Sequence, residues 1–358
     1  MAHGSLMSRI TKAASDAVGT GFFTTRTRFL PPRFDFTTNR RVLRHYRLQI
    51  ADGIFIALPL QRFKMTETPE HEAETLNSAV MKFENSSVLI TGGASGIGKI
   101  MGRMALEKGA SCLIIWDINP QNIKTTIEEL SLIGKVRGYI VDVSKHDIVV
   151  ESYNKVKAEC GNVDILINCA GIVTSNKTFD KQTVDEITRT MNINTIAPML
   201  VTREILPDML KRGKGHICNI ASAGGMLGNP RMSVYGASKW GAIGWSDSMR
   251  IELQAQKSNV RVTTIAPYYI NTGMFNGVKS RIIPILKPEY VARKVIKAIE
   301  KNKTFRGIPF GFHFIRFWQA ILPTRVFDWL FGEVFGIYHI MDAFTGRTGA
   351  PKTVSKVS

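Results

Sequence analysis

Two residues that could exchange a proton lie four positions apart in YGASK, residues 235–239. On an α-helix, Tyr235 and Lys239 would share one face. A tyrosine hydroxyl has an ordinary pKa of about 10, and a nearby ammonium lowers that pKa because it favours the phenolate. The spacing therefore suggests a tyrosine that exchanges a proton with an alcohol or a carbonyl near neutral pH. A solvated helix face with no chemistry is the alternative.

Two more polar residues could assist this chemistry. Ser222 lies 13 residues before Tyr235 and just after the apolar segment HICNI, where its hydroxyl could donate to a substrate oxygen as charge develops. Asn194 lies in MNINTIAP, within a predicted long helix. An amide in the middle of a helix is usually a surface residue, but this one could hold a water that relays protons to Lys239.

A second segment, TGGASGIG at residues 91–98, follows an apolar run and contains Gly92, Gly96 and Gly98. One interpretation is a plain turn, because glycine readily adopts a positive φ. The other is a phosphate cradle, in which the free N–H groups at the start of a helix face an anion. The position of the segment between a strand and a helix would favour the phosphate cradle over the plain turn.

The elements that position these residues follow an alternating pattern. Short apolar segments alternate with helix-length segments, which predicts a Rossmann-type α/β fold: a doubly wound parallel sheet in three layers. The strand-like segments are residues 87–91, 112–116, 136–141, 164–168, 216–220 and 260–266. In such sheets the ligand lies at the carboxyl ends of the strands. TGGASGIG follows the first strand, and this position favours the cradle.

An acidic residue ends the second predicted strand. Asp117 lies 19 positions beyond Gly98, close to the spacing at which a carboxylate holds the adenosine ribose of a dinucleotide. Because this carboxylate would repel a 2′-phosphate, it favours NAD over NADP, and the absence of a basic residue at Ser95 agrees. The alternative is an N-cap for the following helix. Asp142, after the third strand, could bond the adenine amino group.

Taken together, these motifs resemble the short-chain dehydrogenase/reductase family from about Lys82 to about residue 304. TGGASGIG matches the family's Thr-Gly-x-x-x-Gly-x-Gly motif, and residues 168–171 match Asn-Asn-Ala-Gly with Cys169 as the one change. Asn194, Ser222, Tyr235 and Lys239 fall on the family's catalytic tetrad.

The resemblance implies a role for each residue of the tetrad. Tyr235 would be the general acid/base, Lys239 would lower its pKa and bind the nicotinamide ribose, Ser222 would polarise the substrate oxygen, and Asn194 would support the proton relay. No metal site is predicted. The expected cofactor contacts are Gly92, Ser95, Gly96, Ile97, Gly98, Asp117, Asp142, Val143, Asn168, Ala170, Gly171, Tyr235, Lys239, Pro267, Ile270 and Thr272.

One departure lies after the sixth strand, where Tyr268 replaces a glycine that the family usually has, although Pro267 and Thr272 fit. The segment NTGMFNGV, residues 271–278, and the apolar tail are most similar to the retinol dehydrogenase and 17β-hydroxysteroid dehydrogenase branch. That branch acts on lipophilic alcohols and ketones and is often membrane-associated. The resemblance also implies a homodimer or homotetramer formed through the helices around the fifth strand.

Charge is concentrated at the two ends of the chain. Residues 1–64 hold 11 Lys/Arg and 3 Asp/Glu, residues 279–358 hold 14 and 5, and residues 65–278 hold 22 and 21. Basic ends suit a targeting leader or peripheral contact with an anionic membrane. No nucleic-acid-binding module is recognisable, so the overall charge of +18 does not indicate nucleic acid as a partner.

The predicted domains follow these shifts in composition. Residues 1–64 form a basic leader, a disordered extension or a wrongly included upstream segment, and residues 65–82 form an acidic linker. Residues 83–304 form the NAD-binding catalytic domain. Residues 305–358 form an apolar and basic helical extension: extra core or a subunit contact, a lid over a lipophilic substrate, or an in-plane membrane helix pair.

Two apolar helix faces are predicted in that extension. They are formed by Phe314, Phe317, Trp318, Ile321 and Leu322, and by Val326, Leu330, Phe331, Val334 and Tyr338. The four cysteines, with no Cys-x-x-Cys pair, suggest free thiols in a reducing intracellular compartment. We expect a cytoplasmic or membrane-peripheral protein, with organellar import if residues 1–64 are a transit peptide.

The predicted function is NAD-dependent interconversion of a lipophilic secondary or allylic alcohol, retinoid-like or steroid-like, and its carbonyl. Alternatives are a 3-oxoacyl or sugar reductase of the same family, and a non-catalytic NAD(H)-binding sensor or scaffold.

Overall fold

The computed structural model describes residues 46–51, 54–59 and 81–346 of the chain. Contacts divide the chain into two units, residues 1–67 and 68–358. In the first, β1 (Tyr46–Ala51) pairs antiparallel with β2 (Ile54–Pro59). The expected leader or disordered extension therefore contains a hairpin, for which Asp-Gly between two apolar segments was an available signal. The rest of that segment, and nearly all of the predicted linker, lie outside the described residues.

The second unit is built on a seven-stranded sheet in the order β5-β4-β3-β6-β7-β8-β9, with every pair parallel. The strands are β3 (Ser87–Thr91), β4 (Cys112–Asp117), β5 (Val136–Ile140), β6 (Ile165–Asn168), β7 (His216–Ile220), β8 (Arg261–Pro267) and β9 (Phe305–Ile308). The central strands are buried on both faces, as expected for a sheet covered by helices on both sides. The predicted Rossmann-type doubly wound fold is confirmed.

The seventh strand, β9, was not predicted. The sequence analysis ended the catalytic domain at residue 304, whereas the structure places Phe305–Ile308 in the sheet, with Phe305 opposite Thr264 of β8. The four-residue segment FRGI carries an arginine and a glycine, so it lacks the apolar pattern of the other strands. Its backbone hydrogen bonds with β8, and not an apolar pattern of its own, make it a strand.

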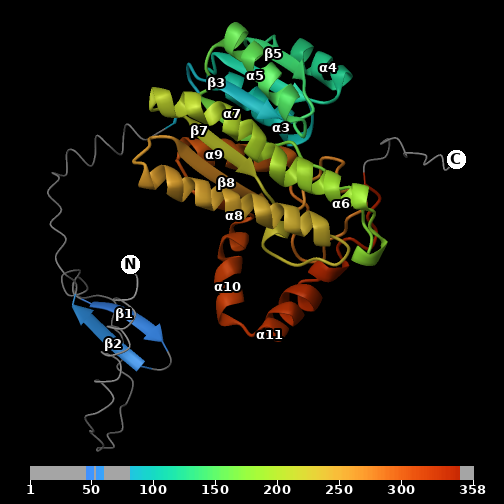
Figure 1. Cartoon of the computed structure of the whole chain (residues 1–358). Helices are drawn as coiled ribbons and strands as arrows, with labels where there is room; N and C mark the ends of the chain where they lie inside the picture. The colour runs from blue at the N-terminus through green and yellow to red at the C-terminus, as the bar shows by residue number, and fades with distance from the viewer. Residues whose placement is uncertain (1–45, 52–53, 60–80, 347–358) are drawn as a thin grey trace, which may run out of the picture. The chain divides into compact units, whose positions relative to one another are not determined.

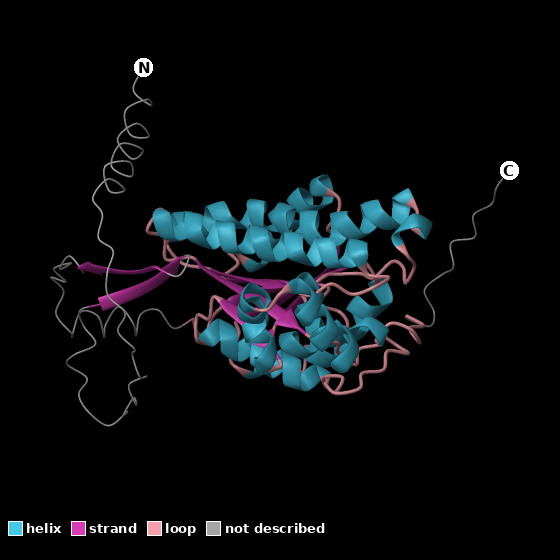
Figure 2. Cartoon of the chain, turned by 90° about the horizontal axis from the view of Figure 1, so that it is seen from below, coloured by secondary structure: helices cyan, strands magenta, loops and turns pink. Residues whose placement is uncertain are grey.

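Helices cover both faces of the sheet, as Figure 2 shows. One core contains side chains of α3, α4 and α9, and the other contains side chains of α5, α7 and α8. The helices are α3 (Gly96–Glu107), α4 (Pro120–Leu130), α5 (His146–Cys160), α6 (Val184–Met191), α7 (Ala197–Arg212), α8 (Ser233–Ala255), α9 (Pro288–Glu300), α10 (Ile315–Ile321) and α11 (Thr324–Asp328). Among the described helices, none has the length and apolarity needed to cross a bilayer.

The helices after β9 pack differently from the rest. Figure 1 shows α10 and α11 projecting from the body of this unit beneath α8. Four of the five residues of the first predicted apolar face (Phe314, Phe317, Trp318 and Ile321) are exposed. This face is therefore not part of the chain's own core.

All four cysteines are free thiols. Cys112 and Cys218 are buried, while Cys160 and Cys169 are partly exposed. The Sγ atoms of Cys112 and Cys160 lie 3.4 Å apart, with Cys112 donating. In the described residues, no group of three or more acidic, histidine or cysteine side chains gathers as a metal site.

Candidate active site

The glycine segment forms a tight turn between β3 and α3. Gly92 has a φ of +66° and its N–H donates to the Trp116 carbonyl oxygen at 2.7 Å. A Cβ on Gly98 would collide with the Gly92 carbonyl oxygen, so only glycine allows this approach. Helix α3 begins without a side-chain cap from Ser95 and without an acidic residue in its first turn. Its free N–H groups and positive dipole end therefore suit an anion such as a pyrophosphate.

The Asp117 carboxylate lies beside this turn, at the end of β4. It accepts hydrogen bonds from the Ala94 N–H at 3.1 Å and the Asn119 N–H at 3.2 Å. The N-cap of α4 is Asn119, whose side chain accepts from Asn122 N–H at 2.9 Å. The alternative interpretation of Asp117 as the N-cap of this helix is therefore wrong. Asp142 is held in a similar way by the Ser144 N–H and hydroxyl.

Three neighbouring cavities that share lining residues lie along the carboxyl ends of the strands, and together we call them the cleft. The section nearest the glycine turn has an empty volume of about 840 Å³, part of which is open to solvent, and we call it the cofactor section. Most predicted cofactor contacts line it: Gly92, Ser95, Gly96, Ile97, Gly98, Asp117, Asp142, Val143, Ala170, Gly171 and Thr272. Tyr235, Lys239, Pro267 and Ile270 line the adjoining section, together with Ser222. The glycine cradle, the uncapped helix and the flanking carboxylates fit an adenine dinucleotide.

Asn168 is the exception among the predicted contacts. It is buried and lines none of these sections. Its Nδ2 donates to Thr202 Oγ1 at 3.1 Å and to Asn219 Oδ1 at 2.8 Å. The motif match made it a cofactor contact, but the structure uses it to join β6 to β7 and α7. Its neighbour Cys169, singled out only as a departure from the motif, does line the cleft.

Tyr235 and Lys239 lie on one face of α8, as predicted, and both are buried, which excludes a solvated helix face. Burial raises the pKa of Tyr235 to about 12, although a hydrogen bond with Ser222 acts in the opposite direction. Burial lowers the pKa of Lys239 to about 8. The sequence predicted a lowered pKa for Tyr235, and that direction is wrong, because burial raises it. The Lys239 ammonium donates to the Ile220 carbonyl oxygen at 3.1 Å and lies 5.9 Å from the centre of the Tyr235 ring.

Ser222 and Asn194 complete this centre. Ser222 Oγ accepts from the Gly224 N–H at 3.1 Å, which fixes the hydroxyl at the end of β7. Asn194 lies in a π-helical turn, Asn192–Ile196, a deviation common at functional sites. It is 1% exposed, not a surface residue. Its Oδ1 accepts from Ile172 N–H at 2.8 Å and its Nδ2 donates to Ser238 Oγ at 3.1 Å.

The loop after β8 explains Tyr268. The ring is buried and packs against Phe312 with ring centres 5.1 Å apart. The phenol lies 3.0 Å from Ser280 Oγ, and the backbone N–H donates to the Ile308 carbonyl oxygen at 2.7 Å. The loop can accommodate a tyrosine where the family usually has glycine, because the Tyr268 side chain packs against Phe312, which follows β9.

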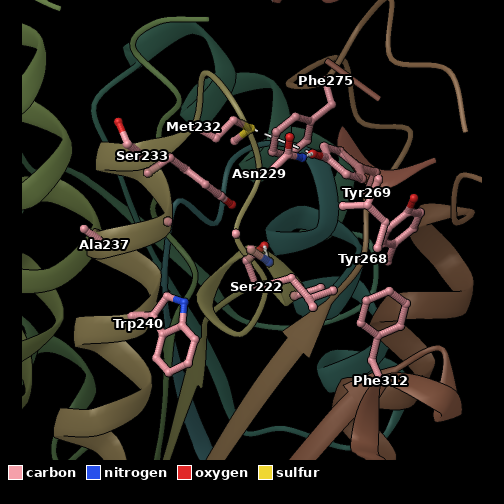
Figure 3. A pocket seen from close by; sticks show the side chains of 17 residues that line it. Ser222, Asn229, Met232, Ser233, Ala237, Trp240, Tyr268, Tyr269, Phe275 and Phe312 are labelled. Atoms are coloured by element: carbon pink, nitrogen blue, oxygen red, sulfur yellow. Dashed lines mark hydrogen bonds between the residues drawn. The ribbon is translucent and has the colours of Figure 1, made fainter. Parts of the chain in front are cut away.

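Beyond Ser222 and Tyr235 lies a section with an empty volume of about 740 Å³, part of which is open to solvent, and we call it the substrate section. Figure 3 shows Trp240 and Ala237 of α8 on one side, and Tyr268 and Phe312 on the other. Phe275 meets Tyr235 edge to face, with ring centres 6.0 Å apart. None of the following lining residues was individually predicted to have a site role, although a lid over a lipophilic substrate was one alternative for residues 305–358: Leu227, Asn229, Met232, Trp240, Tyr268, Tyr269, Phe275, Phe312 and Ile337. These residues come from separate segments of the chain and share no sequence spacing. Only the segment NTGMFNGV, which contains Phe275, was singled out in the sequence as a sign of the substrate class.

Comparisons with known proteins agree with this geometry. The family model for short chain dehydrogenases matches residues 86–282. Epidermal retinol dehydrogenase 2 of Mus musculus is 35% identical over 266 residues, which is 73% of this chain and 85% of that protein. Estradiol 17-beta-dehydrogenase 11 of Homo sapiens is 35% identical over 66% of this chain and 79% of that protein.

A crystal structure of a short-chain dehydrogenase/reductase from Burkholderia phymatum in complex with NAD has the same fold. Its TM-score is 0.62 at 20% identity, covering 67% of this chain and 95% of that one. The sequence relatives are retinol and 17-beta-hydroxysteroid dehydrogenases, as the sequence analysis suggested. The chain belongs to the short-chain dehydrogenase/reductase family, in the retinol and hydroxysteroid dehydrogenase branch, and is an oxidoreductase that acts on CH–OH groups.

Proposed function

We propose that this enzyme uses NAD to interconvert a lipophilic secondary or allylic alcohol, of retinoid or steroid size, and its carbonyl. The observation that carries the proposal is the substrate section, where aromatic and aliphatic side chains adjoin Tyr235. Such a wall favours an apolar substrate through burial of its surface. The named retinol and estradiol dehydrogenase relatives support the same substrate class.

The preference for NAD rests on Asp117. Its carboxylate lines the cofactor section, where it would accept hydrogen bonds from ribose hydroxyls and repel a 2′-phosphate. When bound, the nicotinamide ring accepts or supplies the hydride. The chain's own residues then have to position the substrate and move its proton.

The proton is assigned to Tyr235. In oxidation its phenolate takes the alcohol proton, and in reduction its phenol gives a proton to the carbonyl oxygen. Ser222, fixed by Gly224, donates to the same oxygen. Burial of Tyr235 opposes the phenolate, and the ammonium of Lys239, 5.9 Å from the centre of the Tyr235 ring, would act against burial by favouring it. The same ammonium would hold the nicotinamide ribose. Asn194 supports the relay from Lys239, since Asn194 Oδ1 and Lys239 Nζ both lie beside Gly171.

The substrate assignment is tested with Trp240→Ala. Trp240 lines the substrate section but is 45% exposed, so the fold should tolerate its truncation. We expect KM for a retinoid-sized alcohol to rise about tenfold, through lost apolar contact, while KM for a short allylic alcohol changes less than about twofold. Phe179→Ala, an exposed position outside the cleft, is the control. Equal effects on both alcohols would contradict a lipophilic substrate.

The family resemblance also supports a homodimer or homotetramer through α7 and α8. Both helices keep large apolar side chains exposed, Leu210 on α7 and Ile251 on α8. Sedimentation of Leu210→Asp and Ile251→Asp variants tests this assembly, and an unchanged mass in both would contradict it.

A further inference from the structure

Two polar side chains of the substrate section take no part in the proton transfer described above. Asn229, in the loop before α8, donates from Nδ2 to the Tyr269 hydroxyl at 2.7 Å. Both residues line the substrate section, and Figure 3 shows them next to each other, with Met232 beside them. We call Asn229 and Tyr269 the polar pair.

The polar pair has unused hydrogen-bonding capacity. Asn229 Oδ1 is buried, and no described residue donates to it. The Tyr269 hydroxyl directs its own proton to Met232 Sδ at 3.8 Å, and a thioether sulfur is a weak acceptor. Rotation of the amide by half a turn would exchange its oxygen and nitrogen. In either orientation one amide atom stays without a partner.

The surroundings of the polar pair make this shortfall costly. Met232, Phe275 and Val278 belong to the same apolar cluster as Tyr269. An amide oxygen in such surroundings is destabilising unless a hydrogen bond compensates it. Among the buried side-chain atoms without a partner in the described residues, Asn229 Oδ1 is the one whose residue lines the substrate section. A ligand in that section is therefore the natural source of the missing bond.

A hydroxyl group has the chemistry that completes the polar pair. Its proton can go to Asn229 Oδ1 while its oxygen accepts from the Tyr269 phenol, because a hydroxyl both donates and accepts. Burial raises the pKa of Tyr269 above its ordinary value, so the phenol keeps the proton that it would donate. A carbonyl oxygen only accepts, and it would leave Asn229 Oδ1 without a partner.

The polar pair is distinct from the reacting centre. In the described residues, no hydrogen bond joins Asn229 or Tyr269 to Ser222 or Tyr235. The Phe275 ring contacts both places edge to face: its centre lies 4.9 Å from the centre of the Tyr269 ring and 6.0 Å from that of Tyr235. The polar pair is thus placed to meet a part of the ligand other than the reacting carbon.

Met232 covers the polar pair in this structure. It is 5% exposed and its sulfur lies against the Tyr269 hydroxyl. Methionine is unbranched and has three rotatable side-chain bonds. The Met232 side chain can therefore turn aside when a ligand oxygen replaces its sulfur beside Tyr269.

We propose that the polar pair binds a second hydroxyl of the substrate, so that the enzyme prefers lipophilic alcohols with two hydroxyl groups over those with one. This inference rests on the proposed function, because it requires the alcohol to bind in the substrate section.

The first test compares kcat/KM of the full chain with NAD for alcohols of one rigid apolar skeleton, with and without a second hydroxyl. The second hydroxyl is tertiary, so its carbon has no hydride to lose and only one position reacts. It is moved around the skeleton in a series of isomers. We expect at least one diol to be preferred tenfold or more, or about 1.4 kcal/mol. A series in which no diol exceeds the mono-alcohol would overturn the inference.

The second test assigns the preference to the polar pair. Tyr269→Phe removes the hydroxyl, and Asn229→Leu removes the amide, with little change in side-chain volume. Each should lower the ratio of kcat/KM for the preferred diol to that for the mono-alcohol at least fivefold, because a buried hydroxyl without partners is disfavoured. An unchanged ratio in both variants, including equal losses on the two alcohols, would show a merely structural role and overturn the inference.

Ser280→Ala is the control for these variants. It removes a hydroxyl that lies 3.0 Å from the phenol oxygen of Tyr268, the residue next to Tyr269, and Ser280 does not line the substrate section. The ratio should stay as in the unaltered chain. A loss of preference as large as that in Tyr269→Phe would mean that the loop as a whole, and not the polar pair, sets it, which overturns the inference.

The third test separates this inference from the proposed function. Calorimetric titration of the two alcohols into the chain with NADH measures binding where no oxidation can occur. The diol should bind with a Kd at least tenfold lower, and Tyr269→Phe should remove most of that difference. Absence of turnover with this difference retained would contradict the proposed function alone. Turnover of both alcohols with equal Kd values would overturn the role of the polar pair and leave the proposed function standing.

Discussion

The two ends of the cleft recognise their ligands by different means. The cofactor section presents backbone N–H groups of a glycine turn and the start of α3, with carboxylates at two strand ends. The substrate section presents side chains, many of them aromatic, from α8, the loop after β8 and the residues after β9. Backbone recognition depends on glycines at fixed spacing, and so it can be read from a sequence. A side-chain wall assembled from distant segments carries no such pattern.

This contrast predicts where substitutions act. Changes at the junction of the two sections should abolish the reaction, and changes in the cofactor section should leave alcohol recognition intact. Changes in the sheet core away from the cleft should affect stability alone.

The largest effect is expected at the junction, where Tyr235 lines both the substrate section and its neighbour. Tyr235→Phe removes the proton donor and keeps the ring, so turnover should fall on the order of 10³-fold. Titration of NAD(H) should show unchanged affinity. Turnover within tenfold of the unaltered enzyme would remove Tyr235 from the reaction.

The next effect concerns His216, which is fully buried at the start of β7, at the end of the strand away from the cleft. Burial, together with the charge of Arg261, lowers its pKa to about 3. Below pH 6.5, His216 is protonated in the unfolded chain but stays neutral in the folded chain. The free energy of unfolding that this group contributes above pH 6.5 is therefore lost as the pH falls toward 3. The slope is about 1.4 kcal/mol per pH unit, or about 5 kcal/mol over that range. Urea unfolding from pH 7 to 4 measures it, and His216→Gln should flatten the slope. An equally steep slope in the variant would contradict this assignment.

A smaller effect is expected in the cofactor section. Gly98→Ala forces a Cβ against the Gly92 carbonyl, which should lower the free energy of unfolding by about 2 kcal/mol and weaken NAD binding. Gly244→Ala in α8 is the matched control, because its Cβ would meet nothing within 4 Å. That control should be neutral or stabilising by up to about 1 kcal/mol. Calorimetry and NAD titration distinguish the two, and equal behaviour would show that the turn tolerates a side chain.

The smallest effect is one of preference. Asp117→Ala removes the charge that disfavours a 2′-phosphate, so the ratio of kcat/KM for NAD to that for NADP should fall about tenfold, or about 1.4 kcal/mol. KM for the alcohol should not change. The exposed Asp180→Ala serves as control. An unchanged ratio would mean that another group sets the preference.

Much of this architecture was predictable, because apolar strands and a glycine turn express local chemistry. Six of the seven sheet strands were found from buried segments such as CLIIW. β9 was missed because the segment FRGI lacks the apolar pattern of the other strands, and only its pairing with β8 makes it a strand. The pKa of Tyr235 was misjudged for a related reason: the spacing placed Lys239 on the same helix face but carried no information on burial, which raises that pKa. The motif match at Asn168 likewise gave no information on the direction of its side-chain amide, which bonds Thr202 and Asn219 inside the fold and does not line the cleft.

The most direct measurement of the central claim is nicotinamide absorbance of the purified full chain with NAD or NADP and a panel of alcohols from short and polar to retinoid and steroid, with Tyr235→Phe as the blank. We predict turnover with NAD and with the lipophilic alcohols, absent in the blank. Turnover confined to short polar alcohols, a clear preference for NADP, or NAD binding without turnover of any alcohol would contradict it.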